Sequence, residues 1–177
     1  MKTIESFECP DKHYDVVSSL LAGKFIIYGD TLFDVVNSNL NYYVAFFELT
    51  YKYELIKTSE VIYISSQSSA ENFSKEIMLI LAVIAYELNL QGKNLYEELF
   101  VSFTIKSISE LIASSSYAKV CKSIDIDKFF SKCERRNLVK VGSGNTIRFT
   151  SAIKIFLEHA KKISEIDDHP LEDGLEI

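Results

Sequence analysis

The sequence has little proline or glycine, with two prolines and six glycines among 177 residues. Flexible or extended linkers are rich in these residues, so any two domains should pack closely together or share a helix. The three cysteines, Cys9, Cys121 and Cys133, are too few and too widely spaced for a disulfide framework, and no paired cysteine or histidine spacing indicates zinc. We therefore expect reduced thiols, no metal and no cofactor.

Long apolar runs are also missing. The longest run, from Ile77 to Tyr86, has ten residues, about half of what a bilayer-spanning helix needs. The N-terminus lacks the apolar segment of a secretory signal. We expect a buried helix at residues 77–86 and a cytoplasmic protein that does not enter a membrane.

Catalytic motifs are missing as well. The stretch Gly142–Asn145 lacks the lysine of a phosphate-binding loop and precedes a predicted strand, whereas such a loop opens a helix. The three histidines have no acid or thiol neighbour at catalytic or metal-binding spacing. The sequence therefore predicts that the protein is not an enzyme.

What the chain does contain is a large apolar fraction and an uneven charge. Hydrophobic residues make up 47% of the chain, with ten tyrosines and twelve phenylalanines, as expected of a globular protein. The net charge is −6, yet residues 105–162 carry 12 basic and 5 acidic side chains, and residues 163–177 carry 6 acidic side chains and no basic one. A basic module thus lies between acidic segments.

The apolar pattern predicts one order of elements twice. In each half, a helix is followed by a strand, two further helices and a hairpin. Asp30 is placed to cap the second helix of the first half, and Ser107 the corresponding helix of the second half. This is the element order of a winged helix, and its recurrence predicts two such units in tandem.

A match between the two halves supports this repeat. Phe46-Phe47 precede Leu55 by the same spacing with which Phe129-Phe130 precede Leu138, at an offset of 83 residues. We therefore expect an α+β fold, mainly α. Its expected parts are a first winged-helix domain in residues 1–66, a second in 67–150, a closing helix in 151–166 that Ser151 can cap, and an acidic tail in 167–177.

The third helix of the second half carries a basic stripe. Lys128, Lys132 and Arg135 follow one another at i, i+4 and i+7, opposite the apolar side of the helix. Such a row can contact phosphates without reading bases, although an ordinary solvated face has the same pattern. With their neighbours, the DNA-binding candidates are Lys128, Lys132, Arg135, Arg136, Lys140 and Arg148.

The corresponding helix of the first half is aromatic and has no such stripe. Interfaces between proteins are enriched in aromatic residues and depleted of charge at their centres, so this helix is expected to bind protein, although some of its tyrosines can equally belong to the core. The protein-interface candidates are Tyr42, Tyr43, Phe46, Tyr51 and Tyr53.

Several stretches together resemble a known family. They are "LLAGKFI", "NYYVAFFELTYKYELI" running into "VIYIS", "LYEELF", and a basic helix-hairpin that ends in "IRFT". In this order, over roughly residues 14–166, the chain is similar to MukE and its MksE relatives, the tandem winged-helix (KITE) subunits of bacterial MukBEF-type SMC condensin complexes.

The resemblance implies a non-enzymatic, nucleoid-associated subunit that forms a homodimer. It would bind the kleisin, which bridges the heads of the SMC ATPase, and through it join the ATPase. It implies weak, sequence-independent contact with DNA during clamping, in chromosome organisation and segregation or in plasmid defence. The alternative from the residues alone is a free-standing winged-helix transcription regulator, which would need a basic recognition helix on a dimer.

Overall fold

The computed structural model describes residues 9–65 and 72–159. The predicted acidic tail, the predicted boundary between residues 66 and 67 and the end of the closing helix lie outside these residues.

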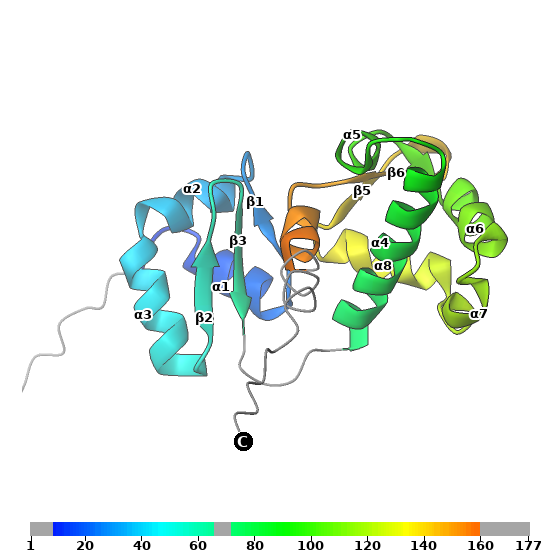
Figure 1. Ribbon diagram of the computed structural model, residues 1–177. Coiled ribbons are helices and arrows are strands. Elements are labelled where there is room, and N and C mark those ends of the chain that lie inside the picture. The colour runs from blue at the N-terminus through cyan, green and yellow to red at the C-terminus, as the bar shows by residue number, and fades with distance from the viewer. Residues whose placement is uncertain (1–8, 66–71, 160–177) are drawn as a thin grey trace, which may run out of the picture.

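The first half is a three-stranded sheet with three helices around it (Figure 1). Its elements are α1 (His13–Leu21), β1 (Ile26–Ile27), α2 (Thr31–Ser38), α3 (Leu40–Tyr51), β2 (Glu54–Lys57) and β3 (Val61–Ser65). The strands are antiparallel in the order β1-β3-β2. Asp30 caps α2 as predicted, because its carboxylate accepts a 3.0 Å hydrogen bond from the backbone N–H of Leu32.

The second half has the same arrangement with two additional short helices. Its elements are α4 (Asn72–Leu90), α5 (Leu95–Leu99), β4 (Phe103–Thr104), α6 (Ile105–Ser114), α7 (Ala118–Cys121), α8 (Ile126–Arg135), β5 (Val139–Val141), the 3₁₀ turn η1 (Ser143–Asn145) and β6 (Thr146–Phe149). A final helix follows at residues 153–159 and lies between the two halves in Figure 1. The sheet order is β4-β6-β5. The expected combination of mainly helices with small antiparallel sheets is confirmed.

The two sheets differ in register by one residue from the predicted correspondence. Leu55 lies opposite Ile64, and Val139 lies opposite Phe149. In the ladders Leu55 therefore corresponds to Val139, so the offset of 83 that paired it with Leu138 is wrong here. The cause is a longer helix end in the second half. The left-handed Asn137 lies seven residues after Phe130 and two before Val139, whereas the left-handed Lys52 lies five residues after Phe47 and three before Leu55.

Two of the predicted caps are also shifted. Helix α6 begins at Ile105, and its cap is Thr104, whose side chain accepts a hydrogen bond from Ser107 N–H while the Ser107 hydroxyl accepts one from Thr104 N–H. Thr104 ends a strand in extended conformation, so it reaches this geometry one turn earlier than predicted. Likewise the hydroxyl of Thr150, not Ser151, accepts from the N–H of Ala152 before the last helix.

The buried residues form two cores. The smaller core joins α1, α2 and α3 to the first sheet, with Tyr43 and Phe47 fully buried, whereas the larger core belongs mainly to the second half and also includes Val61 of β3. The larger core is built on α4, where Ile77, Ile80 and Ile84 are almost fully buried, which confirms the expected buried helix. Burying side chains of this size contributes roughly 1.5–3 kcal/mol each, so α4 is the main stabilising element of the second half.

The halves are joined at Phe25, just before β1. Its N–H donates to the carbonyl oxygen of Arg136 at 3.0 Å, and its own carbonyl accepts from the side-chain amide of Asn137 at 3.0 Å. The Phe25 ring contacts Tyr63 and the ring of Phe156 in the last helix. We call this set of contacts the Phe25 junction.

We expect the replacement Asn137→Ala to loosen the Phe25 junction. It removes a hydrogen bond and places alanine at a φ of 63°, where residues other than glycine and asparagine are strained. Asn145→Ala is the matched control, because Asn145 has a φ of 56° but no side-chain hydrogen bond within the described residues. Urea unfolding should show that Asn137→Ala costs about 1 kcal/mol more than Asn145→Ala. Equal costs would contradict a stabilising role for the junction.

The three thiols should differ in reactivity. Cys9 is exposed, whereas Cys121 and Cys133 are buried. Burial raises the pKa of the Cys133 thiol to about 12 and also raises that of Cys121, so both stay protonated at pH 8 and are poor nucleophiles. Iodoacetamide should modify Cys9 alone in the native protein and all three after denaturation, as read by mass spectrometry. Rapid modification of native Cys133 would contradict the buried position of α8.

Candidate nucleic-acid and protein interfaces

Helix α8 presents the basic stripe on its outer side. Asp125 caps the helix by accepting a 3.1 Å hydrogen bond from Lys128 N–H. That bond, with the Lys128 ammonium beside it, lowers the pKa of the Asp125 carboxyl. The opposite side of α8 is buried through Phe129, Phe130 and Cys133, which fixes the stripe on the surface as the sequence predicted.

The cations of this stripe already have contacts of their own. Lys128 forms an exposed ion pair with Asp125 at 3.1 Å, and Lys132 pairs with Glu76 of α4 at 3.5 Å. The exposed Lys128–Asp125 pair contributes little and is weakened by salt, so Lys128 can exchange its partner for a phosphate. The Lys132–Glu76 pair is partly buried, so Lys132 is held more firmly. Arg135 has no ion pair in the described parts of the chain, and its Nε donates to the carbonyl of Ser131 at 3.3 Å.

Arg136 differs from the other DNA-binding candidates. Its guanidinium lies over the Phe73 ring, 4.3 Å from the centroid, and close to Gly23 of the first half. A cation packed on an aromatic face stabilises the fold, and the carbonyl of the same residue belongs to the Phe25 junction. Arg136 is therefore primarily a structural residue, half-buried between the two halves.

The remaining two candidates lie on the hairpin. Lys140 of β5 is directly opposite Arg148 of β6, and both side chains are exposed. They line a cavity of about 340 Å³ between the halves, whose walls are formed by Ile27, Glu60, Phe100, Lys140, Arg148, Phe149, Thr150, Ser151 and Lys154. The structure thus divides the six predicted cations into a stripe on α8, a packed arginine and a hairpin pair.

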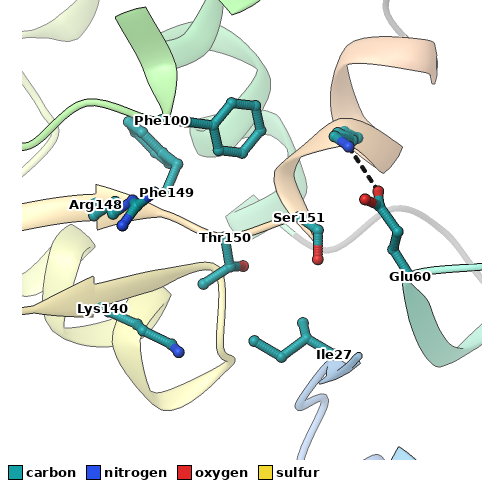
Figure 2. A pocket seen from close by; sticks show the side chains of 9 residues that line it. Ile27, Glu60, Phe100, Lys140, Arg148, Phe149, Thr150 and Ser151 are labelled. Atoms are coloured by element: carbon teal, nitrogen blue, oxygen red, sulfur yellow. Dashed lines mark hydrogen bonds and ion pairs between the residues drawn. The ribbon is translucent and has the colours of Figure 1, made fainter. Parts of the chain in front are cut away.

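Sequence reasoning missed the other side chains of this cavity. Lys154 forms a 2.7 Å ion pair with Glu60, which comes from the turn before β3, and its ammonium is 5.7 Å from the Phe100 ring centroid (Figure 2). No local pattern connects these residues, because Glu60 and Lys154 are 94 residues apart. They come together because the two halves pack against each other.

The aromatic candidates form a chain of ring contacts along α3. The rings of Tyr42 and Phe46 are stacked, the Phe46 ring meets the Tyr51 ring edge to face, and the rings of Tyr51 and Tyr53 are stacked. Tyr43 is an exception: it is fully buried, so its assignment to a protein interface is corrected to a core role. It falls on the buried side of α3 with Phe47, four residues further on.

One apolar residue on this surface was not predicted. Leu49 is 73% exposed and follows Tyr42 and Phe46 at i+7 and i+3, on the same side of α3. Its helical spacing from Tyr42 and Phe46 could have indicated this position, but the sequence prediction included only aromatic residues. We call Tyr42, Phe46, Leu49, Tyr51 and Tyr53 the α3 face.

The N-terminal end of the α3 face is held by polar contacts. The Tyr42 hydroxyl donates to Cys9 Sγ at 3.6 Å and lies 3.5 Å from His13 Nδ1. Burial, followed by the hydrogen bond to Cys9, raises the pKa of Tyr42 to about 12. Because of this raised pKa, Tyr42 stays a neutral hydrogen-bond donor at neutral pH. The ring of His13 also packs against Phe46, and these contacts hold the Tyr42 ring in place.

Neither a cluster of metal ligands nor a membrane-spanning helix occurs among the described residues. No group of three or more potential metal ligands lies together within residues 9–65 and 72–159. Over those same ranges, no helix combines the length and the apolar character needed to cross a bilayer.

Comparison with known proteins places the chain in a family. No curated protein matches the sequence. The family model described as "Condensin complex protein MksE" matches residues 11–161, which include both halves and the last helix. The chain therefore belongs to the MksE family and is a subunit of the condensin class of complex.

Proposed function

We propose that this MksE-family chain is a non-enzymatic accessory subunit that binds the kleisin of an SMC complex and assists DNA clamping. It acts as a homodimer at the nucleoid, in chromosome organisation and segregation or in plasmid defence, and ATP hydrolysis belongs to the SMC partner. The observation that carries the proposal is the contrast between α3 and α8, two corresponding helices of which one is aromatic and the other basic.

The proposal includes two tandem winged helices as the scaffold. Both halves have the order helix, strand, helix, helix, strand, strand once the short α5 and α7 are set aside. In both sheets the last strand lies in the centre, between the first strand and its hairpin partner. On this division α3 and α8 are the third helices, the position from which a winged helix reads or holds its ligand.

The α3 face supports protein binding. Helix α3 contains no lysine or arginine, so it has no charge with which to hold a phosphate backbone. Its outer side combines partly exposed rings with an exposed leucine, the composition of an interface centre. A kleisin segment that buries this surface would remove apolar area from water at about 25 cal/mol per Å².

The α8 stripe supports DNA contact. Three cations lie along one helical face, as contact with a phosphate backbone requires, and the exposed Lys128–Asp125 pair needs little energy to open. No observation favours the alternative of a free-standing regulator, because α3 lacks the basic side chains of a recognition helix. The expected DNA contact is weak, salt-sensitive and independent of sequence.

We expect Leu49→Lys to weaken kleisin binding at least tenfold. The change places a charge on the α3 face, where it would have to be desolvated on binding, and Leu49 is exposed, so folding is not disturbed. Affinity for the kleisin of the same organism is measured by calorimetry. Tyr96→Lys is the control, because Tyr96 is 54% exposed but lies on α5. Unchanged kleisin affinity in Leu49→Lys would contradict binding at this face.

We expect the triple change Lys128→Glu, Lys132→Glu and Arg135→Glu to reduce DNA retention by the assembled complex at least tenfold. Each lost phosphate contact should also reduce the salt dependence of binding by about one unit of slope. The matched control changes the exposed Lys93, Lys106 and Lys119 to glutamate, which alters net charge by the same amount. Equal DNA retention by the two triple variants would refute the α8 contact.

A further inference from the structure

The cavity between the halves is a second basic site, separate from the α8 stripe. Figure 2 shows Ile27 and Glu60 of the first half facing Thr150 and Ser151, with Lys140 extending into the gap between them. Its volume of about 340 Å³ lies in the range of small-ligand sites. Both halves supply walls, so the cavity depends on how the halves are joined.

The lining has a surplus of positive charge. Glu60 is neutralised by Lys154 at 2.7 Å, so its carboxylate is already paired when an anion approaches. Lys140 and Arg148 have no ion pair within the described residues. The lining therefore carries two uncompensated positive charges.

The pairing of strands β5 and β6 places the charges of Lys140 and Arg148 next to each other. Lys140 and Arg148 are register partners in the β5–β6 ladder, and like charges directly opposite each other on one face destabilise a sheet. An anion between them converts this repulsion into two attractions. The hairpin thus has a specific electrostatic reason to bind a group with more than one negative charge.

The remaining lining supplies a donor and apolar walls. The hydroxyl of Ser151 makes no hydrogen bond within the described part of the chain and points into the gap in Figure 2, so it can donate to an anion. Thr150, by contrast, is already engaged, because its hydroxyl donates to the carbonyl of Asn137. Ile27 and the Phe100 ring form apolar walls beside the cations.

We infer that this cavity binds a phosphate group, held by Lys140 and Arg148 and by the hydroxyl of Ser151. A phosphomonoester carries about −1.5 to −2 charges at neutral pH, which matches the two uncompensated cations. The planar guanidinium of Arg148 can donate two parallel hydrogen bonds to phosphate oxygens. The group comes either from a mononucleotide or from a nucleic-acid backbone, and the site does not depend on the α8 contact proposed above.

The test is a titration of the ¹⁵N-labelled full chain with inorganic phosphate at constant ionic strength, followed by NMR. We expect saturable shifts at the amides of Lys140, Arg148 and Ser151, and an affinity at least tenfold lower in Arg148→Gln. Lys119→Gln, which changes an exposed lysine of α7 outside both basic sites, is the control and should leave phosphate affinity unchanged. Arg148 is exposed, so the variant should fold.

Two further arms identify the source of the phosphate. If adenosine monophosphate shifts the same amides at lower concentration than inorganic phosphate, the ligand is a nucleotide. If a short DNA duplex displaces inorganic phosphate from these amides in an Arg148-dependent way, the ligand is a nucleic-acid backbone. Shifts that do not saturate, or that are equal in Arg148→Gln and in the unaltered chain, would overturn the inference. The triple α8 variant should retain phosphate binding, so the two proposals can fail separately.

Discussion

The Phe25 junction is the contact on which the arrangement of the molecule depends. The larger core reaches into the first half at Val61, and the backbone of Phe25 in the first half is hydrogen-bonded to Arg136 and Asn137 in the second. These two residues occupy the turn that leads from α8 into β5. The same turn therefore sets the end of the basic helix, the start of the hairpin and the position of the first half, so the two candidate surfaces have a fixed relation.

Asn137 contributes to the position of the two halves through both its backbone and its side chain. A left-handed conformation is needed to turn the chain from α8 into β5, and asparagine tolerates it better than most residues. Its side chain then bonds the carbonyl of Phe25, which would otherwise lose a partner near the interface of the halves. Lys52 makes the equivalent turn after α3, but its side chain carries no such bond within the described residues. Each half thus has a left-handed turn after its third helix, but in the described residues only the turn of the second half forms a side-chain hydrogen bond to the other half.

Much of the fold could be predicted from the sequence because periodic patterns are local. The apolar spacing of α4, the cap at Asp30 and the outward stripe of α8 each depend on neighbours within a few residues. The predictions that were wrong depend on one residue more or less, as in the cap of α6 and the offset between Leu55 and its counterpart, because periodicity does not fix boundaries to a single residue. Tyr43 was misassigned for another reason, because an aromatic side chain can belong to a core or to an interface and only its packing beside Phe47 decides between them.

The cavity could not be predicted, because its parts are distant in the sequence. Lys140 and Arg148 were recognised as cations, but their opposition follows from hairpin register, and the Glu60–Lys154 pair follows from the packing of the halves. The Glu60–Lys154 pair also determines which cations of the lining are free to bind an anion. With Lys154 neutralised, the repulsion between Lys140 and Arg148 is the main uncompensated electrostatic interaction in the lining, and binding an anion is the simplest way to relieve it. The three groups that would hold the anion all follow Asn137 in the chain, so the Phe25 junction acts on this site by placing the walls from the first half, Ile27 and Glu60, beside them.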